Sequence, residues 1–109
     1  MNRLICFVTF LTILVATSGV QAQMGGNPRD GFALAQQMCS QCHAIRAGQA
    51  RPSNSRSPTF VELATTPGMT GTALFVALTT PHAGMPMFVL SAAQKDNIIA
   101  YILSLKADD

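Results

Sequence analysis

Two cysteines and a histidine lie close together in this 109-residue chain, as Cys39-Ser40-Gln41-Cys42-His43. Two thiols three positions apart can each add across one vinyl group of a haem and form two thioether bonds. The histidine that follows then lies beneath the porphyrin, where its imidazole can bind the iron. The C-x-x-C-H spacing therefore predicts one covalently attached haem c, bound through Cys39 and Cys42, with His43 as an iron ligand.

Other chemistries of paired cysteines explain this pattern less completely. A disulfide or a thioredoxin-like redox pair needs no adjacent histidine, and the redox pair belongs to a βαβ context. A zinc site needs a second pair of ligands, whereas the only histidine besides His43 is His82. We therefore favour the haem interpretation.

The N-terminal residues have the features of an export signal. Met1-Asn2-Arg3 is a short basic start, Leu4 to Ala16 is almost wholly apolar, and Val20-Gln21-Ala22 is a small-residue cleavage site. The apolar run is too short to cross a bilayer comfortably and has no basic flank behind it, although an uncleaved anchor is the alternative. We expect residues 1–22 to be a cleaved signal peptide and the mature protein to lie in the periplasm.

Residues 23–109 are expected to form one domain. A domain of this size has a marginal hydrophobic core, and a haem joined at three points would stabilise it. Cys6 leaves with the signal, so Cys39 and Cys42 are the two cysteines of the mature chain. Six Arg or Lys residues nearly balance five Asp or Glu residues there. Without a basic stripe, nucleic acid is not an expected partner.

Local signals predict four helices and no strand. Asn27-Pro28 is a cap and first-turn pair for a helix that runs into Cys39. Residues 48–57, rich in Gly, Pro and Ser, predict a surface loop. A second short helix is expected over about residues 58–64.

The third helix is expected over about residues 70–78, and the fourth begins with a capping box of Ser91 and Gln94. The predicted buried face of the third helix consists of Leu74, Phe75 and Leu78. The apolar positions of the fourth helix recur at helical spacing, at Ile98, Ile99, Ile102 and Leu105.

The order of these motifs resembles the class I c-type cytochromes over essentially the whole mature sequence. The matching residues, besides the haem motif, are Gly31-Phe32, Ser57-Pro58-Thr59-Phe60, Met85-Pro86-Met87-Phe88 and residues 100–106. The resemblance implies an all-α cytochrome c fold, with about four short helices wrapped around one haem. It also implies that the terminal helices cross through Gly31, Phe32 and Tyr101.

The resemblance further implies the second iron ligand. In similar proteins the methionine of a Met-Pro pair binds the iron, which corresponds to Met85. Gly84 bends the loop before this methionine and Pro86 stiffens it afterwards. Met87 and His82 are the alternatives.

One supporting role follows from the same resemblance, and a second is suggested by charge alone. The backbone carbonyl of Pro58 is expected to accept a hydrogen bond from Nδ1 of His43 and so orient the ring. Arg46 and Arg51 are candidates for the haem propionates, which the sequence does not otherwise identify.

With His43 and Met85 both on the iron, no position is open for a substrate, so we expect an electron carrier and not an enzyme. A peroxidase would need an open iron position and an acid–base pair, and no Asp or Glu stands near Met85. The expected partners are redox proteins such as a dehydrogenase, an oxidase or a respiratory complex, with no membrane anchor after signal cleavage. The alternative function is a haem-bearing subunit or sensor of a larger dehydrogenase or oxidase.

Overall fold

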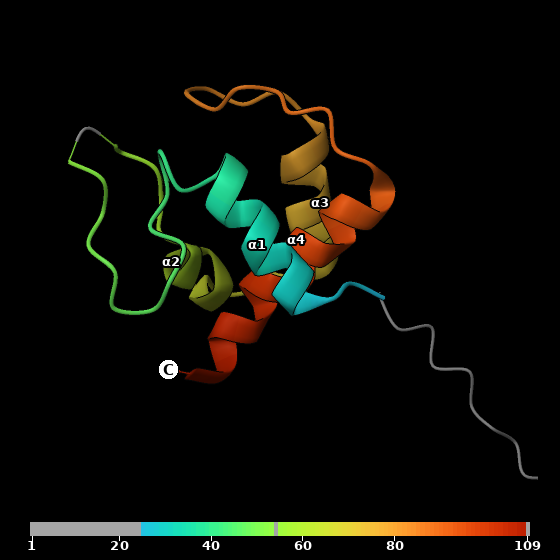
Figure 1. The fold of residues 1–109 in the computed structure, drawn as a ribbon, viewed down its shortest axis with the longest axis horizontal. Coiled ribbons are helices and arrows are strands. Elements are labelled where there is room, and N and C mark those ends of the chain that lie inside the picture. Colours follow the sequence, from blue (N-terminus) through green and yellow to red (C-terminus); the bar gives the residue numbers. More distant parts are fainter. Residues whose placement is uncertain (1–24, 54, 109) are drawn as a thin grey trace, which may run out of the picture.

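The computed structural model describes residues 25–53 and 55–108, and the expected signal peptide lies outside them. This part of the chain consists of α-helices and one 3-10 turn, with no strand (Figure 1). The elements in chain order are α1 (Pro28–Met38), α2 (Phe60–Thr65), α3 (Gly71–Thr79), α4 (Ala92–Ser104) and the 3-10 turn η1 (Leu105–Asp108). The predicted all-α fold is confirmed.

Polar side chains cap the start of each α-helix. Asn27 caps α1 and accepts a hydrogen bond from the Arg29 amide at 2.9 Å, with Pro28 in the first turn as predicted. The predicted capping box of Ser91 and Gln94 is present at the start of α4. Caps of this kind satisfy amide groups that have no partner within the helix.

The second helix starts later than the sequence suggested. A capping box of Thr59 and Glu62 places its first helical residue at Phe60, so Pro58 lies outside the helix. The expectation of a helix from residue 58 was therefore wrong by two residues, because the Thr-x-x-Glu signal outweighs the preference of proline for a first turn.

Helices α1 and α4 cross in close contact, as predicted. A Cβ atom added at Gly31 would lie 1.9 Å from the Asn97 carbonyl oxygen, so only glycine permits this approach. Beside it, the rings of Phe32 and Tyr101 meet edge to face with centroids 5.3 Å apart. The Asn97 side chain also accepts a hydrogen bond from the backbone amide of Asn27 at 2.7 Å.

Helix α4 supplies more buried hydrophobic residues than any other helix in the described ranges. Its predicted apolar face is buried at Ile98, Ile99 and Ile102, and Leu105 continues it. These side chains pack against buried residues of the other three α-helices, namely Ala35, Phe60, Ala64 and Leu74. Burial of this face holds the short helices together, since helices of this length are marginal alone.

One predicted core residue faces outward. Phe75 is 37% exposed, and Lys95 lies over its ring at 5.1 Å from the centroid. Leu74 is buried and Leu78 half-buried on the other side of α3. The prediction of Phe75 in the buried face was wrong because α3 is apolar around most of its circumference, so periodicity alone does not select the inward side.

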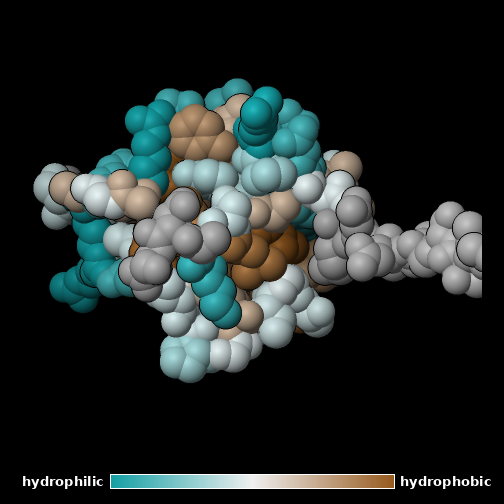
Figure 2. Space-filling view, turned by 90° about the horizontal axis from the view of Figure 1, so that it is seen from below, coloured by the Kyte–Doolittle hydropathy of each residue, from teal (hydrophilic) through white to brown (hydrophobic). Residues whose placement is uncertain are grey.

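Two long loops lie outside the helices (Figure 1). The first joins α1 to α2 and contains the predicted loop of residues 48–57. The second leaves α3, extends away from the helices and returns to α4. On the face shown in Figure 2, strongly hydrophobic residues lie in the middle and hydrophilic residues surround them. None of the helices in the described ranges is both long and apolar enough to cross a membrane.

Candidate haem site

A cavity of about 690 Å³ opens between α3, α4 and the two long loops. Its walls are mostly apolar, with Leu63, Leu74, Ile98 and Ile102 among the residues that line it. A volume of several hundred Å³ with apolar walls and a few polar groups is typical of a cofactor site.

The two cysteines and the histidine of the C-x-x-C-H motif all line this cavity. Cys39 is the C-cap of α1, and its carbonyl accepts hydrogen bonds from the Cys42 amide at 3.1 Å and the His43 amide at 2.9 Å. These bonds continue the chain as a tight turn beyond the helix. The turn brings both sulfurs and the imidazole to one wall, as attachment of one haem requires.

The environment of Cys39 does not suit a redox pair. Burial of this thiol raises its pKa to about 11, whereas Cys42 is exposed. A thioredoxin-like pair works through a thiolate whose pKa is lowered by neighbouring positive groups. Within the described ranges, no cluster of three or more His, Cys, Asp or Glu residues is arranged to bind a metal ion by itself.

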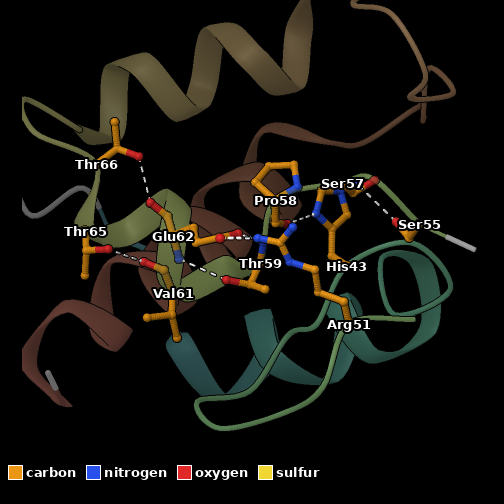
Figure 3. Close-up of polar contacts among 10 residues, drawn as sticks. All are labelled: His43, Arg51, Ser55, Ser57, Pro58, Thr59, Val61, Glu62, Thr65 and Thr66. Carbon is orange, nitrogen blue, oxygen red and sulfur yellow. Dashed lines mark hydrogen bonds and ion pairs between the residues drawn. The ribbon is translucent and has the colours of Figure 1, made fainter. Parts of the chain in front are cut away.

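The His43 ring is oriented by the backbone. Its Nδ1 lies 2.7 Å from the Pro58 carbonyl oxygen (Figure 3). A carbonyl can only accept, so Nδ1 carries the hydrogen and the lone pair of the neutral ring lies on Nε2. The Phe60 ring packs beside the imidazole with centroids 5.4 Å apart. The contact expected between His43 and Pro58 is therefore present, and it leaves Nε2 free to act as a ligand.

The loop between α3 and α4 brings Met85 to the cavity. Met85 lines the wall, whereas Met87 is 54% exposed and does not. Gly84, with φ of +82°, makes the bend before Met85, in a conformation that favours glycine. Of the two methionines in the Met-Pro-Met segment, Met85 is thus the one that faces the site.

His82 also reaches this wall. Its side chain is exposed, yet it lines the cavity, and Nε2 lies 3.1 Å from the sulfur of Met85. The backbones of the two residues form an isolated antiparallel bridge. Sequence reasoning treated His82 only as an alternative to Met85. The short separation, with two residues between them and Gly84 as one of the two, was the signal that they could lie together.

The arginines suggested for the propionates are engaged elsewhere. Arg46 stacks over Phe32, 4.9 Å from its centroid. Arg51 pairs with Glu62, whose pKa is lowered first by the hydrogen bond from the Thr59 amide and also by this arginine (Figure 3). Neither arginine lines the cavity, so this expectation was wrong: the loop carries both side chains to other partners.

Arg56 is the cation at the cavity. It lines the wall together with Ser55 and Ser57, and no ion pair joins it to an acid within the described residues. The Ser55 hydroxyl accepts from the Ser57 amide at 3.1 Å (Figure 3). It donates its own hydrogen to the Cys42 carbonyl. Sequence reasoning missed this role because Arg56 is one of three arginines in the same loop.

The residues present therefore fit a haem. Two cysteines and a histidine from one turn line an apolar cavity, a methionine lines it from a separate loop, and Arg56 and the Ser57 hydroxyl offer partners for carboxylates.

The family described as cytochrome C oxidase, cbb3-type, subunit III matches residues 26–102 of the chain. The chain belongs to the monohaem c-type cytochromes. It is 33% identical over 94 residues to cytochrome c-552 of Bradyrhizobium diazoefficiens, and this alignment covers 86% of the present cytochrome and 89% of the relative. No solved structure matches the cytochrome significantly. The family establishes that the cofactor is a covalently bound haem c with iron and that the protein carries electrons.

Proposed function

We propose that this cytochrome is a periplasmic one-electron carrier whose haem is joined to Cys39 and Cys42 and whose iron is bound by His43 and Met85. One observation carries the proposal: these four side chains, from two segments far apart in the sequence, line the same cavity. The haem, when bound, supplies an iron that changes by one charge between its ferrous and ferric states.

The chain's own residues prepare this site for electron transfer. The Pro58 carbonyl holds His43 in the tautomer and orientation that ligation needs. The bend at Gly84 presents the Met85 sulfur, a ligand that raises the reduction potential. Apolar walls keep water from the iron, which limits solvent rearrangement as the charge changes.

Arg56 and Ser57 are assigned to the haem propionates. An arginine can bind a carboxylate through two parallel hydrogen bonds, and the Ser57 hydroxyl can donate a further one. The assignment is supported by their common position in the wall and by the engagement of Arg46 and Arg51 with other side chains.

Location in the periplasm rests on the N-terminal sequence. N-terminal analysis of protein from the periplasmic fraction is expected to find a chain that begins at Gln23, after cleavage behind Ala22. Retention of Met1 together with recovery in the membrane fraction would contradict a cleaved signal and favour an anchored carrier.

The experiment that tests the proposed carrier is a redox titration of the purified holoprotein, followed by its visible spectrum. We expect one reversible one-electron wave, with a six-coordinate low-spin iron in both states. A high-spin iron in either state, or rapid binding of cyanide to the wild-type protein, would mean that an iron position is open and would contradict the carrier.

A second candidate function follows from the matched family, whose description names a subunit of an oxidase. In that case the cytochrome would work as the haem subunit of a larger complex. Purification from native membranes and periplasm distinguishes the two: a free carrier is recovered alone, whereas a subunit is recovered in fixed stoichiometry with an oxidase.

A further inference from the structure

The position of His82 beside Met85 is not used by the proposed electron carrier. Both residues line the cavity from the loop between α3 and α4, and Nε2 of His82 lies 3.1 Å from the Met85 sulfur. The Met85 amide and the His82 carbonyl, 3.4 Å apart, join the two backbones. The two side chains are therefore held at the same place on the cavity wall.

Both ring nitrogens of His82 lie beside atoms that can accept a hydrogen bond. Nδ1 lies 3.2 Å from the Thr80 carbonyl oxygen, which can only accept a hydrogen bond. In the tautomer with its hydrogen on Nδ1, the Thr80 carbonyl accepts that hydrogen and Nε2 presents a lone pair. In the other tautomer, Nε2 donates to the Met85 sulfur. A backbone carbonyl that holds one nitrogen while the other is left free is the arrangement found in metal-binding histidines.

The imidazole nitrogen and the thioether sulfur thus lie 3.1 Å apart, and both are atoms that can bind a haem iron. In the tautomer with its hydrogen on Nδ1, both atoms offer a lone pair to one electrophile. The four porphyrin nitrogens fill the other positions around a haem iron, so only one of the two donors can occupy the position opposite His43 at a time. A shift of about the distance between the two atoms exchanges one for the other.

We propose that His82 is a reserve iron ligand, which occupies the distal position through Nε2 whenever the Met85 sulfur leaves it. The inference rests on the proposed function, because it takes Met85 as the resident ligand. Replacement of sulfur by an imidazole removes the ligand that raises the potential, so the exchanged form is a weaker oxidant. The iron stays closed to external ligands in both forms.

The test compares the ferric holoproteins of Met85→Ala, Met85→Ala/His82→Ala and Met85→Ala/His82→Gln by electron paramagnetic resonance and by cyanide titration. We expect Met85→Ala to remain low-spin with two nitrogen ligands, and both double variants to become high-spin. Cyanide should bind Met85→Ala at least about tenfold more weakly than the double variants. If His82 leaves the iron open for only about one-tenth of the time, the apparent affinity for cyanide falls about tenfold. Met87→Ala, from the same loop but outside the cavity, serves as the control and should resemble the wild type.

Two results would overturn the inference. If Met85→Ala is high-spin and binds cyanide as tightly as the double variants, His82 does not reach the iron. If the double variants stay low-spin, another group is the replacement ligand. Failure of the proposed function looks different: the wild-type protein itself would then lack the far-red charge-transfer band of a sulfur–iron bond, whatever the variants show.

Discussion

Replacement of Gly31 by alanine tests the crossing of α1 and α4, on which the geometry of the haem motif depends. Helix α1 ends at Cys39, so the angle at which it crosses α4 fixes where the first thioether sulfur lies. An added Cβ would lie 1.9 Å from the Asn97 carbonyl oxygen, 2.5 Å from its carbon and 2.9 Å from Cβ of Tyr101. These obstacles are backbone atoms and a Cβ, which cannot rotate away.

The magnitude follows from the separation that the helices would need. Ordinary van der Waals contact of a Cβ atom begins at 3.4 Å. A Cβ only 1.9 Å from the Asn97 carbonyl oxygen therefore requires the helices to move apart by about 1.5 Å. Overpacking of this kind costs about 3 kcal/mol at the upper end of its usual range. Alanine recovers about 1 kcal/mol through its higher helix propensity. We therefore expect Gly31→Ala to lower the free energy of unfolding by about 2 kcal/mol.

Guanidinium denaturation of the holoprotein, followed by helical circular dichroism, measures this change. Ala33→Ser is the matched control, since Ala33 is exposed on the same helix, and should change the free energy by no more than about 0.5 kcal/mol. A Gly31→Ala protein as stable as the wild type, or more stable, would refute the close crossing described here.

Three further predictions address other parts of the structure. Tyr101→Phe removes the hydroxyl that donates to the Ile45 carbonyl at 2.6 Å, and should cost ~1–2 kcal/mol in chemical denaturation while the ring contact with Phe32 is kept. Cys39→Ala/Cys42→Ala should release its haem into acid acetone, whereas the wild type retains it on the polypeptide. The Glu62 pKa is lowered, so this carboxylate stabilises the fold above its ordinary pKa and loses that effect as the pH falls through the lowered value. Glu62→Gln should therefore be less stable than the wild type at neutral pH and equally stable in acid.

Features set by neighbouring residues could be predicted from the sequence. The Asn27 cap, the capping box of Ser91 and Gln94, and the buried face of α4 depend on spacings within one or two turns. The capping box of Thr59 and Glu62 belongs to the same class and could have been found in the same way. The contact of His43 with Pro58 followed from the family resemblance and is also present.

Features set by contacts between distant segments could not be predicted. The side of α3 that faces the cavity depends on α4, because the helix is apolar around most of its surface, and so Phe75 was misplaced. The three loop arginines look alike in sequence, and only the fold gives Arg46 to Phe32, Arg51 to Glu62 and Arg56 to the cavity.

The most direct test of the central claim, that Met85 completes a His/Met-bound haem, is the far-red sulfur-to-iron charge-transfer band of the ferric holoprotein. The wild type and Met87→Ala should both show the band, and Met85→Ala should lose it together with a fall in reduction potential. Retention of the band in Met85→Ala with its loss in Met87→Ala, or a wild type without the band, would contradict the claim.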